Sequence, residues 1–269
     1  EEAIESYRQA IRIDPDYAKA HYGLGVAYGK SGRYEEAIES YKQALRINPD
    51  DAYAHNNLGI AYYELGKYQE AIESYRQAIR IDPDYADAHN NLGYAYGELG
   101  RYEEAIESCK QAIRIDPEDA DFHDSLGYAY NLLGKYEEAI ESFKQAIRID
   151  PDHVDAHFKL GNAYNKLGKH EEAIEAYKQA IRIDPEDADT HFNLGITYNM
   201  PIVNDRGSGI TYNMPIVNDR GSSITYNMPM VNDIGSAIIN DRDSALEQYE
   251  ILKKLDSELA NKLFNLINK

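Results

Sequence analysis

The stretch AHNNLGIAYYELGKYQEAIESYRQAIRIDPD, residues 54–84, decides the fold because close copies of it recur along the chain at a constant spacing of 34 residues. Two series of residues mark the copies: the prolines Pro15, Pro49, Pro83, Pro117, Pro151 and Pro185, and the Leu-Gly glycines Gly25, Gly59, Gly93, Gly127, Gly161 and Gly195. A fixed period of this size predicts a repeat protein in which each unit packs against its neighbours.

Each unit divides at a glycine into two segments whose apolar residues recur with helical spacing. In the second segment of one unit, Ala37, Ile38, Tyr41, Ala44 and Leu45 fall on a single stripe, as in an amphipathic helix. The dividing glycines can adopt the left-handed backbone conformation that ends a helix. They are Gly32, Gly66, Gly100, Gly134 and Gly168. The sequence therefore predicts an all-α fold in which every unit is a helical hairpin.

The unit resembles the tetratricopeptide repeat (TPR). The family pattern is an aromatic residue, Leu-Gly, Tyr, Ala, a second aromatic residue, Ala and Pro. It is matched here by His55, Leu58, Gly59, Tyr62, Ala71, Tyr75, Ala78 and Pro83, and only the leading aromatic position departs from it. Five consecutive units carry the pattern over residues 18–187, and a sixth begins at Ala188. The resemblance implies a right-handed α-solenoid of antiparallel helix pairs, whose first helices line a concave groove that binds peptides or partner proteins.

A peptide-binding groove is thus the site that the resemblance implies. The residues expected to line it are Tyr22, Val26, Asn56, Ile60, Tyr63, Asp87, Asn90, Tyr94, Asp121, Asp124, Tyr128, Asn131, Phe158, Asn162 and Asn165. They lack the Lys and Asn pattern with which some family members clamp a terminal carboxylate. Asn can bind a peptide backbone through both a donor and an acceptor, and Tyr offers contact area at low entropic cost. Because acidic residues outnumber Lys, we expect an extended, neutral or basic peptide. The alternative is that these are merely solvated residues of regular repeats.

Composition narrows the class of partner. The 269 residues have a formal net charge of -19, 43% hydrophobic residues and one cysteine. An acidic chain is repelled by phosphate backbones and anionic headgroups, and no apolar run approaches the roughly 20 residues of a membrane helix. Cys109 has no second cysteine with which to form an internal disulfide, so nothing indicates an oxidising compartment. We expect a cytoplasmic protein with protein or peptide partners, and neither nucleic acid nor membrane.

Regularly spaced histidines raise the possibility of a metal site, but packing explains them better. They are His21, His55, His89, His123, His157 and His191, one per unit. Because helix pairs stack on the order of 10 Å apart, neighbouring imidazoles would not meet at one ion about 2 Å away. Cys109 stands where other units have Tyr or Phe, which favours a core residue over a nucleophile. No catalytic constellation stands out, so we expect no enzyme activity, cofactor or metal.

Residues 201–238 interrupt the sixth unit with 14-residue near-copies that repeat ITYNM, the end of the preceding first segment. Deleting them would place Ala245 and Tyr249 in the register of the other second helices. The prolines and β-branched residues of this insert disfavour a long helix. We expect a non-helical insert, either an irregular loop or short antiparallel strands; short helices are a third alternative.

The chain is therefore predicted to have five segments. Residues 1–14 are the second helix of a truncated N-terminal repeat, 15–200 hold repeats one to five and the first helix of repeat six, 201–238 are the insert, 239–255 the second helix of repeat six, and 256–269 a capping helix with Ser257 as its N-cap. The uncovered apolar stripe of the first segment and the near-identical units of the insert favour a second function class, a self-assembling structural element.

Overall fold

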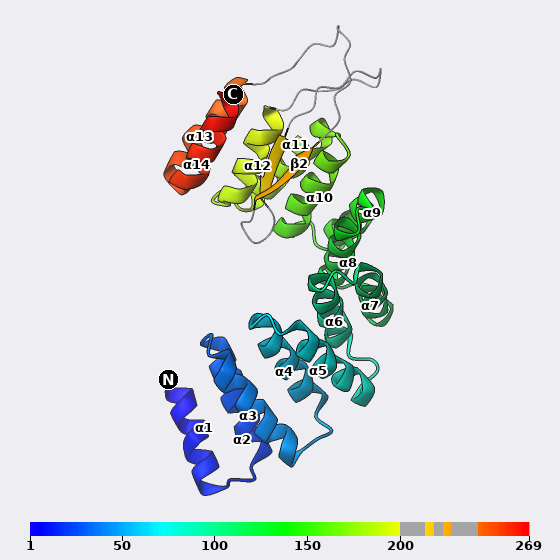
Figure 1. Cartoon of the computed structure of the whole chain (residues 1–269), viewed down its shortest axis with the longest axis vertical. Coiled ribbons are helices and arrows are strands. Elements are labelled where there is room, and N and C mark those ends of the chain that lie inside the picture. The colour runs from blue at the N-terminus through cyan, green and yellow to red at the C-terminus, as the bar shows by residue number, and fades with distance from the viewer. Residues whose placement is uncertain (200–212, 218–222, 228–241, 269) are drawn as a thin grey trace. The chain divides into compact units, whose positions relative to one another are not determined.

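The computed structural model describes residues 1–199, 213–217, 223–227 and 242–268. Within these residues, most consecutive helices pack as antiparallel pairs joined by short turns (Figure 1). The predicted all-α repeat fold is therefore confirmed, apart from one two-stranded sheet in the insert. The chain divides into two compact units, Glu1–Gly134 and Lys135–Lys269.

Unit 1 is built from helices alone. Its helices are α1 (Glu2–Ile13), α2 (Ala18–Lys30), α3 (Tyr34–Ile47), α4 (Ala52–Glu64), α5 (Tyr68–Ile81), α6 (Ala86–Glu98), α7 (Tyr102–Ile115) and α8 (Ala120–Leu132). Helices α2, α4, α6 and α8 are first helices, and α1, α3, α5 and α7 are second helices. The core lies between the two kinds, where Tyr41, Ile72 and Tyr75 are almost completely buried.

Unit 2 contains further helix pairs and the part of the insert that the structure describes. Its elements are α9 (Tyr136–Ile149), α10 (Val154–Lys166), α11 (His170–Ile183), α12 (Ala188–Tyr198), β1 (Asn213–Val217), β2 (Ser223–Asn227), α13 (Arg242–Leu255) and α14 (Ser257–Ile267). Strands β1 and β2 pair antiparallel, with Ile216 opposite Ile224. The rest of the insert lies outside the described residues.

Glycines end the first helices as the sequence predicts. All five dividing glycines have positive φ angles, between +69° at Gly32 and +79° at Gly134. A Cβ atom at any of them would have no neighbour within 4 Å, so the conformation alone requires glycine. Within each compact unit, these turns reverse the chain and bring the second helix of a pair back along its first helix.

A second glycine series allows the two helices of a pair to approach closely. A Cβ added to Gly59 would lie 2.5 Å from Cε1 of Tyr75, and a Cβ at Gly161 would lie 2.6 Å from Cε1 of Tyr177. The tyrosine ring thus occupies the volume that any larger residue would need. In the third 34-residue repeat, Cys109 stands in place of the tyrosine and packs against Gly93.

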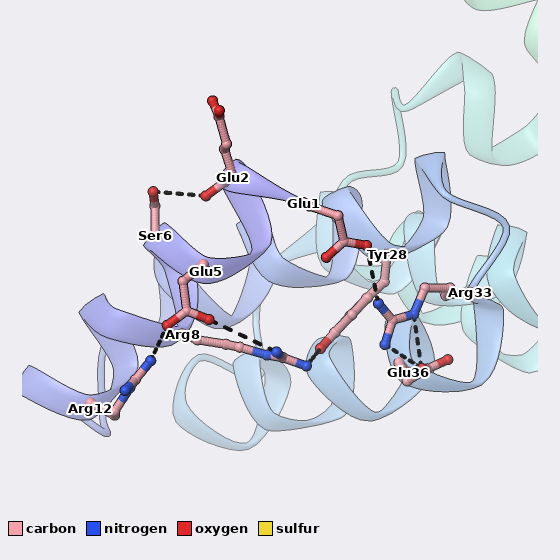
Figure 2. Close-up of polar contacts among 9 residues, drawn as sticks. All are labelled: Glu1, Glu2, Glu5, Ser6, Arg8, Arg12, Tyr28, Arg33 and Glu36. Atoms are coloured by element: carbon pink, nitrogen blue, oxygen red, sulfur yellow. Dashed lines mark hydrogen bonds and ion pairs between the residues drawn. The ribbon is translucent and has the colours of Figure 1, made fainter.

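Successive repeats are joined by a basic side chain over a tyrosine ring. Arg8 of α1 donates a hydrogen bond of 2.8 Å to the Tyr28 hydroxyl, and Arg33 stacks 4.5 Å from the ring centroid (Figure 2). Arg33 is held in turn by Glu36 at 2.7 Å and by Glu1 at 3.9 Å. Equivalent pairs are Lys42–Tyr62, Arg76–Tyr96, Lys110–Tyr130, Lys144–Tyr164 and Lys178–Tyr198. Helix α1 therefore contacts the next repeat as the other second helices do.

The regular histidines fasten the turn between repeats. In every repeat from that of His21 to that of His191, the histidine Nε2 donates to the carbonyl oxygen of the proline six residues earlier, at 2.9–3.1 Å. This bond gives the loop carbonyl a partner that a phenyl ring in the same place would not supply. The histidines thus have a structural role, in agreement with the predicted packing position.

At the C-terminal end of unit 2, α13 and α14 pack on α12. Helix α13 begins 72 positions after α11, which equals one 34-residue period and the 38 residues of the insert. Phe192, Leu252 and Leu263 are buried together in this cluster. The N-cap of α14 is Asp256, whose side chain accepts from the backbone N–H groups of Glu258 and Leu259. The prediction of Ser257 as N-cap was therefore wrong by one residue, because two good capping residues are adjacent.

Candidate functional site

The candidate site is the first-helix face of unit 1, the surface formed by α2, α4, α6 and α8. Amide side chains link the helices along it. Asn57 Nδ2 donates to the Tyr22 hydroxyl at 2.8 Å, and Asn91 Nδ2 donates to Asn56 Oδ1 at 3.0 Å. At the next step the donor position is held by Ser125, whose shorter side chain lies 2.9 Å from the Tyr94 hydroxyl. Each link fixes one first helix on the next.

Between α6 and α8 the serine does not bond to Asn90, the equivalent of Asn56. The Oδ1 of Asn90 is therefore left without a hydrogen-bond partner among the described residues. Asn90 is 8% exposed, and its equivalent in the preceding repeat, Asn56, is 3% exposed. Both predicted groove residues therefore lie beneath the surface. Their main contribution is therefore to the packing of α4 and α6.

Large apolar side chains stand exposed on the same face. Tyr53 is 62% exposed and Ile60 is 37% exposed, both on α4. The Tyr53 ring packs at 5.1 Å on Tyr85, which precedes α6. Burial, with Asp87 as the next cause, raises the pKa of Tyr85 to about 12, so its hydroxyl is neutral at physiological pH. The two packed rings form an apolar surface close to Asp87.

A pocket of about 280 Å³ opens between α4 and α6. It is lined by Ile60, Tyr63 and Glu64 from α4, Tyr75 from α5, and Asn91 and Tyr94 from α6. The Tyr63 hydroxyl lies 3.4 Å from a carboxylate oxygen of Glu98. Among the predicted groove residues, the structure brings Ile60, Tyr63 and Tyr94 together at this pocket.

Carboxylates gather at the start of α6 and α8. Burial raises the pKa of the Asp87 carboxyl, and the nearby charges of Asp119, Asp116 and Asp121 raise it further. The negative charges of these neighbours therefore disfavour the ionised form of Asp87.

Comparison with known proteins identifies the family. The family model described as the cilia and flagella-associated protein 70 C-terminal domain, a TPR domain, matches residues 1–193. The chain belongs to this TPR family. Among solved structures, TTC0263, a thermophilic TPR protein of Thermus thermophilus, is 28% identical with a TM-score of 0.58 over 68% of this chain and 100% of that chain.

Two further TPR structures are similar. MamA is 29% identical with a TM-score of 0.55, over 61% of this chain and 96% of its own. YrrB, described as a TPR protein with an unusual peptide-binding site, is 24% identical with a TM-score of 0.54, over 69% of this chain and 95% of its own. At that identity YrrB supports the fold alone. No curated protein matches the sequence. The TPR fold indicates a scaffold for protein–protein interaction.

In unit 2 the predicted groove residues of this TPR chain lie inside the protein. Asn162 Oδ1 accepts from the Tyr177 hydroxyl at 2.7 Å, and Asn165 Nδ2 donates to that hydroxyl at 3.1 Å and to Thr197 Oγ1 at 2.7 Å. Phe158 is 7% exposed and packs against the Tyr177 ring. A buried tyrosine hydroxyl needs such partners. These three residues are therefore not available to a ligand, and we leave them out of the candidate site.

The remaining predicted residues of unit 1 lie around the site in different environments. Tyr22 and Val26 of α2 are half-buried and pack against the core. On α8, Asp121 is exposed, Asp124 is buried, Asn131 is half-buried, and Tyr128 packs at 6.1 Å on Tyr94. The face is thus continuous from α2 to α8, with the exposed apolar side chains concentrated on α4.

Sequence reasoning missed Glu64, Tyr75, Tyr85 and Asn91 as site residues. Asn91 follows Asn90 in the motif HNNLG, and that doubled amide was an available signal. Glu64 ends its helix and Tyr85 stands in a turn, where helical periodicity gives no direction. Tyr75 belongs to the core pattern, which gives no sign that it also lines a pocket.

Other kinds of site find little support in the described part of this TPR chain. Among its residues, no three His, Cys, Asp or Glu side chains gather so as to hold a metal ion. Burial raises the pKa of the Cys109 thiol to about 12, so the thiolate that a nucleophile requires is disfavoured. None of the described helices combines the length and the apolar character that a membrane crossing demands.

Proposed function

We propose that the first-helix face of unit 1 binds an extended, neutral or basic segment of a partner protein. The observation that carries this proposal is the exposure of Tyr53 and Ile60 beside a pocket on that face. Exposed large apolar side chains rimmed by polar groups are typical of interaction sites. The tyrosines supply contact area with few rotatable bonds, so little conformational entropy is lost on binding.

The negative charge of the face favours a partner segment that carries positive charge. Asp87 and Asp121 stand at the starts of α6 and α8, and Glu64 and Glu98 at the ends of α4 and α6. An acidic segment would meet repulsion at both edges, whereas a basic one would meet attraction. Complementary charge also raises the association rate at low salt.

The test is a selection of random peptides on the immobilised chain, followed by fluorescence polarisation with the enriched peptides. Ile60→Asp places a charge at the centre of the face and should weaken binding about tenfold or more. Ile47→Asp is the matched control, because Ile47 is also 37% exposed but lies on the second helix α3. It should change the dissociation constant less than about twofold. Circular dichroism checks that both variants fold.

Two outcomes would contradict the proposal: no enrichment of any peptide over the bare matrix, or equal weakening by Ile60→Asp and Ile47→Asp. The second would mean that the peptides bind elsewhere or respond only to net charge. The proposal therefore depends on a difference between two positions of equal exposure on the two kinds of helix.

The self-assembling element stays a prediction. It relies largely on residues 201–238, most of which lie outside the described residues. Light scattering of the chain with and without these residues decides it, since a monomer in both forms would exclude that alternative.

A further inference from the structure

We infer that the pocket between α4 and α6 holds one basic side chain, Lys or Arg, of the bound segment. This inference rests on the proposed function, because it assigns a subsite within the same face. It goes further by naming a residue type in the partner and the residues that recognise it.

The size of the pocket fits a side chain. At about 280 Å³ it falls just below the roughly 300–1,000 Å³ of typical small-molecule sites. Its floor is apolar and aromatic, formed by Ile60 with Tyr63, Tyr75 and Tyr94. Such walls suit the methylene stem of a lysine or arginine, which buries its stem while the charged head stays near polar groups.

The polar groups of the pocket favour a cation. Glu64 is exposed at its rim, and no lysine or arginine is among the lining residues. Among the described residues Glu64 makes no ion pair. Asn91 Nδ2 already donates to Asn56, and the Tyr63 hydroxyl lies within reach of Glu98. The tyrosine faces add attraction for a cation placed over them.

The environment of Tyr75 supports this arrangement. Burial raises the pKa of Tyr75, with Tyr63 and Glu64 as further causes. All three residues line the pocket, and no lysine or arginine is among its lining residues. The pocket thus brings three oxygen-bearing side chains together without a positive charge from its own lining.

The protein already uses the same chemistry both between and within its repeats. Lys42 lies 5.6 Å from the Tyr62 ring centroid, and Arg101 lies 4.4 Å from that of Tyr96, with Glu104 holding the guanidinium. An ammonium or guanidinium group beside a tyrosine and a glutamate is therefore compatible with this sequence. In the pocket the cation would come from the partner.

The experiment uses peptides enriched on the wild-type chain in the selection above. Each is resynthesised with its basic residue replaced by norleucine, and both forms are titrated against wild type, Glu64→Gln and Glu103→Gln. Glu103→Gln is the matched control, because it removes the same charge from an exposed position in the first turn of the second helix α7.

We expect enriched peptides to share a Lys or Arg at one fixed position. Norleucine there should weaken binding to wild type about tenfold, and Glu64→Gln should weaken the parent peptide about tenfold, which corresponds to about 1.4 kcal/mol. The norleucine peptide should bind wild type and Glu64→Gln equally, and Glu103→Gln should bind the parent like wild type.

Three outcomes overturn the inference. They are enriched peptides without a fixed basic position, a parent peptide insensitive to Glu64→Gln, and equal weakening of both peptides by Glu64→Gln. If such peptides still lose binding to Ile60→Asp, the proposed function stands and only the basic subsite falls. If no peptide is enriched, both fall together.

Discussion

At the scale of single residues, the histidines of this chain differ in their surroundings. His89 donates through Nε2 to the Pro83 carbonyl oxygen at the turn between two repeats. His170 stands where other repeats have Tyr, and it is half-buried, with its Nδ1 3.1 Å from Asn165 Oδ1. Burial lowers the pKa of His170, because the charged ring would lose its hydration there.

This difference predicts a pH dependence of stability. The pKa of His170 is lower in the folded chain than its unfolded value of about 6.5, so the unfolded state binds the proton more readily. The stability that neutral His170 allows is fully present above about pH 6.5 and is lost as the pH falls below it. His170→Tyr should therefore be more stable than wild type by a margin that grows from about pH 7.5 to about pH 5 in urea unfolding.

Two features make the His170 comparison decisive. Every other histidine is present in both wild type and His170→Tyr, so its contribution cancels in the difference between their unfolding free energies. His170→Phe removes the ring charge without adding a hydroxyl, and it should show the same growth with falling pH. A margin that stays constant over that pH range in both variants would contradict the prediction.

At the scale of the helix pair, the turn after each first helix depends on backbone conformation alone. Gly66 has a φ of +70°, and a Cβ there would have no neighbour within 4 Å. Gly66→Ala should lower the free energy of unfolding by about 1 kcal/mol, and Gly66→Asn by less, since Asn tolerates the left-handed region better. Chemical denaturation of the two variants beside wild type measures both values.

Gly29 provides the control for the Gly66 prediction. It lies in α2 with a negative φ, and the nearest atom to an added Cβ is the Tyr41 hydroxyl oxygen at 4.0 Å. Gly29→Ala should stabilise by about 0.5–1 kcal/mol because alanine loses less entropy in a helix. A loss of stability in Gly29→Ala as large as in Gly66→Ala would show that the turn conformation is not the cause.

The helix pairs could be predicted from sequence because their determinants are local. The stripe from Ala37 to Leu45 and the turn at Gly32 each specify their own element, and the 34-residue period repeats the information. The N-cap of α14 was less certain, because Asp256 and Ser257 can both cap a helix. Side-chain direction at the ends of the first helices depended on neighbours that only the folded chain brings together.

The candidate site could be predicted from sequence only in part. Ile60, Tyr63 and Tyr94 were predicted on one face and do line one pocket. Asn162 and Asn165 stand three periods after the first two of these residues and so share their repeat positions. Their amide groups nevertheless hydrogen-bond to the buried Tyr177 hydroxyl, which the apolar side chain of Ile60 at the equivalent position cannot do. The periodic position of a residue fixes its helix face, but the chemistry of its side chain decides whether it stays exposed.

At the scale of the whole chain, similar interfaces join successive repeats within each unit. A basic residue over a tyrosine recurs from Arg8–Tyr28 to Lys178–Tyr198, and a histidine fastens each intervening turn. In repeat proteins stability is approximately the sum of such neighbour terms. A change confined to one connection should therefore leave the remaining repeats intact.

The insert provides the test of that expectation. The connection from α12 to α13 spans residues 199–241, and deletion of residues 201–238 reduces it to Asn199, Met200, Ile239, Asn240 and Asp241. Shortening a loop from 43 to five residues spans about three halvings, each worth about 0.6 kcal/mol of closure entropy. The deleted chain should unfold at a higher urea concentration, with a gain of about 2 kcal/mol for unit 2.

Geometry allows this deletion because the other helix pairs close over similar distances. Residues 31–33 join α2 to α3, and α12 ends two positions earlier in the repeat than α2 does, so five residues restore the same register. Replacing residues 201–238 by a flexible Gly-Ser segment of equal length is the control, and it should retain the wild-type unfolding midpoint. If the deleted chain lost helical signal or the α12–α13 packing, the insert would supply contacts that unit 2 requires. The five remaining residues would then not restore the repeat register between α12 and α13.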